Sequence, residues 1–241
     1  MRWCYAHLVG IAENLRVVRD RVAAACRRAG RSPDDVTIVG VSKTFPAALV
    51  AEACRAGLAD VGENRVQEAA GKIPQVRALG SHPRWHLVGH LQTNKVKTAL
   101  GLFDIIHSVD SVRLAEAISR HAEHRAPIPV LLEVNAGGEA SKFGFAPEET
   151  GGALEAISRL PGLTVQGLMT VAPLVENPEQ ARPAFRELRR LGQELGLTHL
   201  SMGMTDDFEV AIEEGATMVR IGRAIFGPRE PAWEWARPQE E

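Results

Sequence analysis

The sequence predicts a (β/α)8 barrel, an α/β fold in which eight parallel strands are each followed by a helix. Short apolar runs alternate with segments of helical patterning between residues 35 and 227, and eight such runs are found. Strands separated by helices pair in parallel through right-handed crossovers, and 241 residues match the size of one such barrel. We therefore expect a single domain, 1–241, with the barrel at about 35–227.

An additional helix is expected ahead of the barrel, at about residues 8–29. Its apolar residues recur at spacings of three and four, which places them on one helical face: Leu8, Ile11, Leu15, Val18 and Val22. Gly30 marks the end of this helix, and the turn SPDD leads into the first strand. At the other end of the chain, residues 228–241 are expected to form a tail.

The expected strands and helices alternate along the barrel. The strands are 36–42, 59–62, 85–89, 103–109, 129–135, 164–170, 199–203 and 217–222. The helices between them are 46–56, 64–78, 93–100, 111–124, 147–159, 178–195 and 206–214. A doubly wound open sheet is the alternative. Two of its nucleotide-binding forms are disfavoured, because the sequence lacks G-x-G-x-x-G after the first strand and G-x-x-x-x-G-K-[ST] anywhere.

Composition narrows the functional classes. A net charge of −2 gives no basic footprint for nucleic acid or anionic membranes. The three cysteines, Cys4, Cys26 and Cys54, show neither disulfide-framework nor zinc-ligand spacing. The N-terminal segment does not have the pattern of a signal peptide, and no run is long and apolar enough for a membrane span. We therefore expect a cytoplasmic protein.

Polar or glycine residues stand where nearly every expected strand ends. In a parallel barrel these ends and the loops after them build the active site. The residues are Ser42, Lys43, Glu63, Asn64, His86, Gly89, Ser108, Asn135, Met169, Thr170, Ser201, Gly203, Arg220 and Gly222. Strand ends also face water, where polar residues are common, so this convergence indicates a site without naming its chemistry.

Lys43 and two glycine-bearing turns give the first chemical hypothesis. The turns SMGMTDD (201–207) and RIGRAIFG (220–227) follow the seventh and eighth strands, where barrels commonly bind phosphate. Lys43 ends the first strand, and we expect it to face these turns across the barrel mouth. An amine and a phosphate site together suit pyridoxal 5′-phosphate (PLP), a phosphorylated aldehyde. The alternatives are a lysine that only reaches to water, and glycines that only permit tight turns.

A family resemblance supports the PLP hypothesis. VGVSKTFP, GENRVQE, WHLVGHLQTNK, HSVDS, SKFGF, GLMT, LSMGMTDDFEVAIEEG and VRIGRAIFG occur in this order between residues 8 and 227. They resemble the pyridoxal phosphate homeostasis protein family, single-domain relatives of the alanine racemase N-terminal barrel with fold-type III PLP binding. The resemblance implies that Lys43 holds PLP as an internal aldimine.

The resemblance also implies roles for the other site residues. Ser201, Gly203, Gly222 and Arg223 would belong to the phosphate side of the site, and Arg220 would face the pyridine nitrogen. The residues expected to line the ring and its substituents are Asn64, His86 and Met169. Two positions depart from the family pattern: Arg223 replaces a small hydroxyl residue, and Thr205 replaces a serine.

The resemblance favours a PLP-holding protein over an efficient enzyme. Arg220 cannot give up its proton at ordinary pH, so it keeps the pyridine nitrogen unprotonated and weakens the ring as an electron sink. A racemase resembling alanine racemase also needs a tyrosine from a second domain, whereas Tyr5, ahead of the barrel, is the single tyrosine. We therefore expect a monomeric protein in PLP homeostasis that buffers PLP or delivers it to apo-enzymes.

Three alternatives remain open from the sequence. The protein could be a PLP-dependent amino-acid racemase of low activity, or a regulatory scaffold that senses the vitamin. Lys142, in a glycine-bearing loop, is a second amine that could bind PLP.

Overall fold

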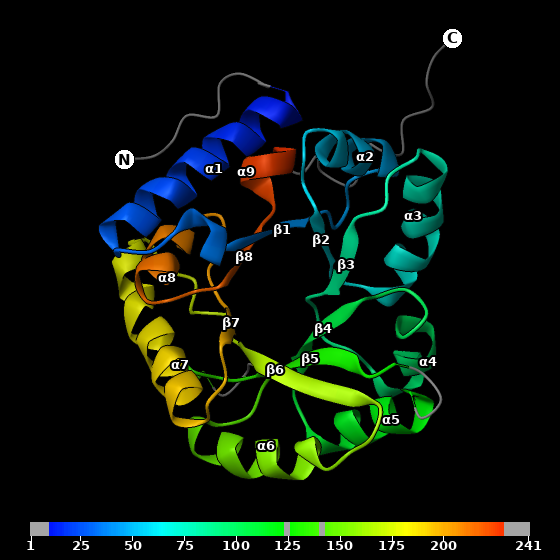
Figure 1. Cartoon of the computed structure of the whole chain (residues 1–241), viewed down its shortest axis with the longest axis vertical. Coiled ribbons are helices and arrows are strands. Elements are labelled where there is room, and N and C mark those ends of the chain that lie inside the picture. The colour runs from blue at the N-terminus through cyan, green and yellow to red at the C-terminus, as the bar shows by residue number, and fades with distance from the viewer. Residues whose placement is uncertain (1–9, 123–125, 140–142, 229–241) are drawn as a thin grey trace.

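A closed barrel of eight parallel strands forms the centre of the protein in a computed structural model that describes residues 10–122, 126–139 and 143–228. The strands follow chain order around the barrel, and β8 pairs with β1 to close it (Figure 1). They are β1 Thr37–Val41, β2 Asp60–Glu63, β3 Arg84–Leu87, β4 Ile105–Val109, β5 Ile128–Glu133, β6 Leu163–Met169, β7 His199–Ser201 and β8 Met218–Ile221. The predicted barrel is confirmed, and the open sheet is excluded.

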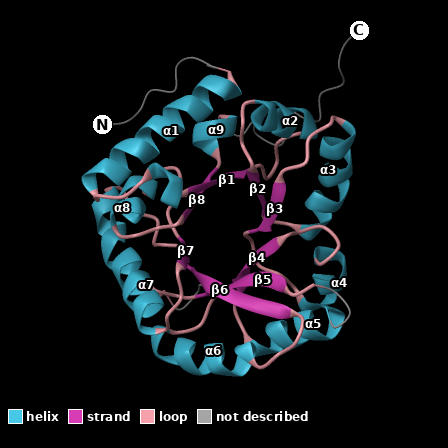
Figure 2. Ribbon diagram, viewed as in Figure 1, coloured by secondary structure: helices cyan, strands magenta, loops and turns pink. Residues whose placement is uncertain are grey.

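Helices surround the barrel in the order predicted, and one further short helix, which the sequence did not predict, follows β8 (Figure 2). They are α1 Ile11–Arg28, α2 Ala47–Arg55, α3 Val66–Ala78, α4 Val96–Ala99, α5 Val112–Ala122, α6 Thr150–Ser158, α7 Arg182–Glu194, α8 Phe208–Glu213 and α9 Arg223–Phe226. Short 3-10 turns are η1 Pro33–Asp35, η2 Thr93–Lys95, η3 Pro147–Glu149 and η4 Pro178–Ala181. None of the helices in the described ranges is long and apolar enough to cross a membrane.

The extra N-terminal helix, α1, packs beside α8 and α9 on the outside of the barrel (Figure 1). Four of its apolar residues are buried at the expected spacing: Ile11, Leu15, Val18 and Val22. The fifth predicted position, Leu8, and most of the predicted tail lie outside the described residues. Because α1 covers α8 and α9, it supports the part of the barrel that carries β7 and β8.

The apolar core has two layers. Most buried apolar side chains fill the space between the strands and the surrounding helices. Inside the barrel, a smaller cluster contains Ile105, Leu131, Met169 and Met218. Polar residues are also buried inside, among them His107 and Arg220. The barrel interior is therefore a packed mixture of apolar and hydrogen-bonded side chains rather than a channel, as expected for eight strands.

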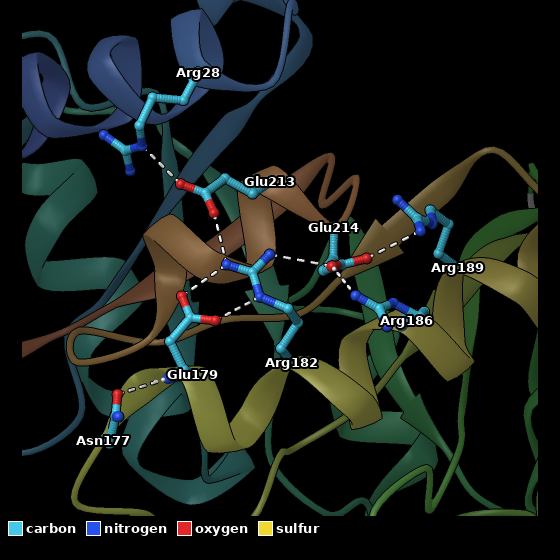
Figure 3. Close-up of polar contacts among 8 residues, drawn as sticks. All are labelled: Arg28, Asn177, Glu179, Arg182, Arg186, Arg189, Glu213 and Glu214. Atoms are coloured by element: carbon cyan, nitrogen blue, oxygen red, sulfur yellow. Dashed lines mark hydrogen bonds and ion pairs between the residues drawn. The ribbon is translucent and has the colours of Figure 1, made fainter.

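An ion-pair network joins three helices on the side of the barrel that carries β7 and β8 (Figure 3). Arg182 of α7 binds Glu213 at 2.7 Å and Glu214 at 3.1 Å, at the end of α8. Glu213 also accepts a hydrogen bond from Arg28 of α1 at 2.7 Å, and Glu214 pairs with Arg189 at 3.0 Å. Such networks stabilise more than isolated surface pairs, so α1, α7 and α8 are held together here.

Candidate functional site

A cavity of about 300 Å³ opens where the carboxyl ends of the strands meet. This is the end of a parallel barrel at which active sites are built. Its lining comes from the ends of β1 and β8 and from the loops after β1, β2, β3, β6, β7 and β8: Val41, Lys43, Phe45, Asn64, Val88, Val171, Leu174, Met204, Thr205, Asp206, Arg220, Gly222 and Arg223. The cavity size is at the lower end of the range for small-molecule pockets.

Lys43 reaches this cavity from a tight turn between β1 and α2. Thr44, directly after it, has a φ of 71°, in the left-handed region that β-branched residues rarely adopt. The Phe45 N–H donates to the Ser42 carbonyl at 3.0 Å and closes the turn around Lys43. The backbone is therefore held in an unfavourable conformation at the candidate amine.

The turn after β7 depends on Gly203 and Asp207. Gly203 has a φ of 89°, and a Cβ there would lie 2.5 Å from the Cβ of Ala211, so no larger residue fits. The Met204 N–H donates to the Asp207 carboxylate at 2.6 Å. Burial raises the pKa of Asp207, while that hydrogen bond lowers it. The turn places the Thr205 side chain on the cavity wall.

Arg223 and Asp206 connect the turns after β8 and β7. Their side chains form an ion pair, and both residues line the cavity. About half of the Arg223 side chain is exposed, so its guanidinium is not sealed inside the protein. A cationic group that can exchange partners is therefore present beside Thr205 and Gly222.

The turn after β8 lies beside Lys43 and not across the mouth from it, so the predicted arrangement was wrong on this point. β8 pairs with β1 in parallel, with Gly40 opposite Ile221. A Cβ on Gly222 would lie 3.3 Å from the Val41 carbonyl oxygen. Barrel closure brings the last strand next to the first, which makes the amine and the turn after β8 neighbours, and the turn after β7 follows one strand further round.

Arg220 forms part of the cavity floor. Its Nη1 donates to the carbonyl and the hydroxyl of Ser201, both at 2.7 Å, and its Nη2 donates to the Thr170 carbonyl at 2.7 Å. Burial lowers the pKa of Arg220 to about 10, and the charges of Asp207 and Glu133 oppose that shift. Arg220 therefore remains a cation at neutral pH, with its orientation set by carbonyl groups.

A chain of hydrogen bonds runs from Arg220 through the barrel interior. It passes from Ser201 to His107 at 2.9 Å, from His107 to His86 at 2.9 Å, and from His86 to Asp60 at 2.9 Å. With both histidines neutral, only one direction satisfies every bond, because Arg220 can only donate and the Asp60 carboxylate can only accept. Ser201 then donates to His107 Nδ1, His107 Nε2–H to His86 Nδ1, and His86 Nε2–H to Asp60.

Burial favours the neutral form of both histidines in this chain, because it lowers the pKa of each. Burial lowers the pKa of His86, against the opposing effect of Asp60. Burial lowers the pKa of His107 still further, and the neighbouring His86 and Arg220 add to that effect. A neutral chain keeps Ser201 available as the acceptor for Arg220, so these residues orient the arginine from below.

Comparison with known proteins identifies the family. The family model "Alanine racemase, N-terminal domain" matches residues 9–230. Pyridoxal phosphate homeostasis proteins from Aquifex aeolicus and Pseudomonas aeruginosa are 47% and 46% identical over 225 and 224 residues. These alignments cover 90% and 91% of this chain and 98% and 96% of the relatives. The chain belongs to the pyridoxal phosphate homeostasis protein family.

Solved structures agree with this membership. PipY from Synechococcus elongatus PCC7942, solved with PLP bound, is 37% identical and superimposes with a TM-score of 0.77. The alignment covers 90% of this chain and all of PipY. The barrel and its mouth are therefore those of a family in which one member is seen with PLP.

The residues predicted to bind the cofactor occupy two levels of the barrel. Lys43, Asn64, Arg220, Gly222 and Arg223 are on the cavity wall. His86, Met169 and Ser201 are buried in the strands beneath it, and Gly203 shapes the turn above Ser201. Side chains two positions apart on a strand share a face, so the residues two positions after His86 and Met169, Val88 and Val171, reach the cavity instead.

Three further residues that the sequence singled out are not in the set of predicted cofactor-binding residues above. Thr205 lines the cavity; the sequence had placed it in the candidate phosphate-binding turn SMGMTDD and as a departure from the family pattern. Its position two residues after Gly203 was the available signal. Lys142 and Tyr5 lie outside the described residues. Within the described ranges, no group of three or more His, Cys, Asp and Glu residues could hold a metal ion.

A second cavity of about 580 Å³ adjoins the first and shares Asn64 with it. Its wall carries the polar residues Arg65, Gln67, His90, Gln92 and Lys95. Gly89, on the wall of the second cavity, packs closely against Asn64, since a Cβ there would lie 2.4 Å from the Asn64 carbonyl oxygen. Asn64 therefore lies between two hollows at the barrel mouth.

Proposed function

We propose that this protein, as a single barrel domain, binds PLP covalently at Lys43 and takes part in intracellular PLP homeostasis. The observation that carries the proposal is one cavity that combines Lys43 with a polar wall formed by Thr205, Gly222 and Arg223. A lysine amine condenses with the PLP aldehyde to an imine and releases one water molecule. Relatives named for PLP homeostasis and a relative solved with PLP support the proposal.

The residues present fit each part of PLP. The Thr205 hydroxyl, the Arg223 guanidinium and the backbone N–H groups after Gly222 would receive the phosphate. Arg220 would donate to the ring nitrogen, and Asn64 would contact the ring substituents. His86, Met169, Ser201 and Gly203 would act from beneath, through packing and through the hydrogen bonds that hold Arg220. Arg223 would have to leave Asp206, at least in part, to meet the phosphate.

The geometry supports a holder of PLP more than an efficient catalyst. PLP catalysis relies on the ring to accept electrons, which a protonated ring nitrogen favours. Arg220 keeps its proton at neutral pH, so it can only donate to that nitrogen. Delivery of PLP to apo-enzymes by a monomer is part of the proposal. A PLP-dependent racemase of low activity is the competing function.

Absorbance spectroscopy and chemical trapping test the covalent site. The purified protein with PLP should show an imine band, and Lys43→Ala should lose it. The matched control is Lys97→Ala, at an exposed lysine of α4, which should keep the band. Borohydride reduction and peptide mapping should then find the label on Lys43. A label found mainly on Lys142 would overturn the assignment.

Comparison of PLP with pyridoxal tests the phosphate side. Hydrogen bonds to a charged group contribute about 1.5–3 kcal/mol each. Loss of the phosphate should therefore weaken binding by at least two orders of magnitude, since about 1.4 kcal/mol is tenfold. Equal affinities for PLP and pyridoxal would show that the turns after β7 and β8 do not bind the phosphate.

Incubation with L-amino acids in heavy water separates the holder from the racemase. A racemase removes and returns the α-proton, so turnover would replace it with deuterium. The proposal expects no exchange above that of free PLP. Exchange that depends on Lys43 would favour the racemase.

A further inference from the structure

A buried ion cluster lies directly behind the turn that carries Lys43. The Lys72 ammonium of α3 binds Glu63 Oε1 at 2.6 Å, Glu68 Oε1 at 2.8 Å and the Ser42 carbonyl oxygen at 2.7 Å. The Ser42 hydroxyl also donates to Glu63 Oε1 at 2.6 Å. Glu63 is fully buried and Lys72 is nearly so. The cluster therefore connects α3 and β2 to the backbone at the end of β1.

The cluster holds the backbone on both sides of Lys43. Before it, the Ser42 carbonyl accepts from Lys72. After it, the Thr44 N–H donates to Glu68 Oε1 at 2.6 Å. Glu68 and Lys72 are four residues apart on α3, so they lie on one helical face and are joined to each other. One face of α3 thus forms hydrogen bonds to the backbone of the turn on both sides of Lys43, and we call this pair of contacts the grip on the turn.

The conformation of Thr44 explains why the turn needs this grip. A threonine with φ of 71° is disfavoured, because its branched side chain crowds the backbone in the left-handed region. Such conformations persist only where surrounding contacts over-determine them. Without the Glu68 acceptor, rotation of Thr44 to a common conformation would change the direction in which Lys43 leaves the backbone.

Stability alone does not account for the cluster. A buried ion group is often no more stable than apolar residues of similar volume, because both charges lose their hydration. The second oxygen of Glu63, Oε2, is buried without a hydrogen-bond partner in the described part of the chain. All three N–H protons of the Lys72 ammonium have acceptors, so Lys72 is not poised as an amine for an aldehyde.

We propose that Lys72 and Glu68 are positioning residues that fix the 42–44 turn so that the Lys43 amine meets an aldehyde bound in the cavity. The inference rests on the proposed PLP function. The amine adds to the aldehyde carbon and one water molecule leaves, so the amine must approach a ligand already placed by its phosphate. The cluster touches the backbone of the turn and acts on that approach, whereas the phosphate side is built by β7 and β8.

Two ligands separate amine positioning from ligand binding in general. PLP can form the imine, whereas 4′-deoxypyridoxine 5′-phosphate has a methyl group in place of the aldehyde and binds only non-covalently. Lys72→Met removes the charge and keeps the length of the side chain. We expect it to weaken PLP binding at least tenfold and to leave binding of the deoxy analogue within twofold. Lys97→Met, the same replacement at an exposed lysine of α4, is the matched control and should leave both affinities unchanged.

Glu68→Ala provides a second variant, because the Glu68 side chain is 27% exposed and its loss leaves less buried charge unpaired. It should show the same loss of PLP affinity relative to the analogue. Equal weakening of both ligands in either variant, or weakening of neither, would overturn the positioning role. If Lys72→Met does not fold, Glu68→Ala alone decides.

Hydrogen exchange in the cofactor-free protein tests the contacts of Glu68 and Lys72 with the turn independently of PLP binding. The Thr44 amide should exchange slowly in the wild type and at least tenfold faster in Glu68→Ala. A wild type that binds PLP no better than the deoxy analogue would refute covalent binding at Lys43. Unchanged exchange at Thr44 in Glu68→Ala would refute the grip on the turn, whatever PLP does.

Discussion

Replacement of Glu133 by glutamine should make the protein more stable at alkaline pH. Glu133 ends β5, and its side chain is partly buried near Asp110 and Arg220. Burial, followed by the charge of Asp110, raises the pKa of Glu133 from 4.5 to about 7, against the opposing effect of Arg220. The folded state therefore favours the protonated carboxyl, which glutamine resembles in shape and lack of charge.

The sign and size of the expected stability change follow from the linkage between protonation and folding. A carboxyl whose pKa is raised on folding contributes its stabilisation fully below the unfolded pKa, and loses it as pH rises through the folded pKa. The window here is pH 4.5 to about 7. At about 1.4 kcal/mol for each pH unit the full effect is roughly 3 kcal/mol, and partial solvent screening reduces it to about 2 kcal/mol.

Urea unfolding of the cofactor-free wild type and Glu133→Gln between pH 4.5 and pH 8.5 measures the effect. The free energy of unfolding of the variant relative to the wild type should rise by about 2 kcal/mol across that range. Glu148→Gln, at an exposed position, controls for replacement of a glutamate as such. A difference between wild type and Glu133→Gln that does not change with pH would refute the reasoning.

Other substitutions test the remaining parts of the site. Arg220→Glu should increase slow transamination between bound PLP and amino acids, because an acceptor at this position favours the protonated ring nitrogen. The formation of pyridoxamine phosphate measures this reaction. No increase in a variant that still binds PLP would show that Arg220 does not face the ring nitrogen. Thr205→Val should weaken PLP about tenfold in equilibrium titration, for loss of one charge-assisted hydrogen bond; an unchanged affinity would exclude a hydroxyl contact. Ser201→Ala should lower the free energy of unfolding by about 1–3 kcal/mol in urea, because His107 and Arg220 lose a buried partner; unaltered stability would contradict the hydrogen-bond chain. Gly89→Ala should displace the Asn64 backbone and weaken PLP in the same titration, since its Cβ would lie 2.4 Å from the Asn64 oxygen; wild-type affinity would show that Asn64 is not needed.

The architecture was predictable because it follows from local patterns. Each strand of a parallel barrel is buried on both faces, so it appears in the sequence as a short apolar run, and each helix restores a period of three to four. Even the short strand β7 was found, because Ser201 and Gly203 follow an apolar residue and precede a helix. Strand ends then indicated where a site should be, since all eight ends meet at one rim.

The sequence did not predict how deep within the barrel each site residue lies. The sequence placed His86, Met169 and Ser201 near strand ends, as it did Lys43, yet they lie one level below the cavity. Two successive side chains on the same face of a strand are two residues apart. The end of a strand cannot be placed from sequence to within two residues, so the pattern does not say which of the two side chains reaches the cavity. The family resemblance supplied the residues of the site, but it could not state which of them reach the cavity wall and which support it.

The sequence by itself determined the barrel, the order of its elements, the family and the lysine expected to carry the cofactor, because these depend on residue spacing and on motifs within short segments. Tertiary structure decided that the turn after β8 stands beside Lys43, since closure of β8 onto β1 joins residues about 180 positions apart. It also decided that Lys72 and Glu68 grip the turn around Lys43, and that a line of hydrogen bonds from Asp60 orients Arg220. These contacts depend on the directions of side chains from different strands and helices, which no local pattern specifies.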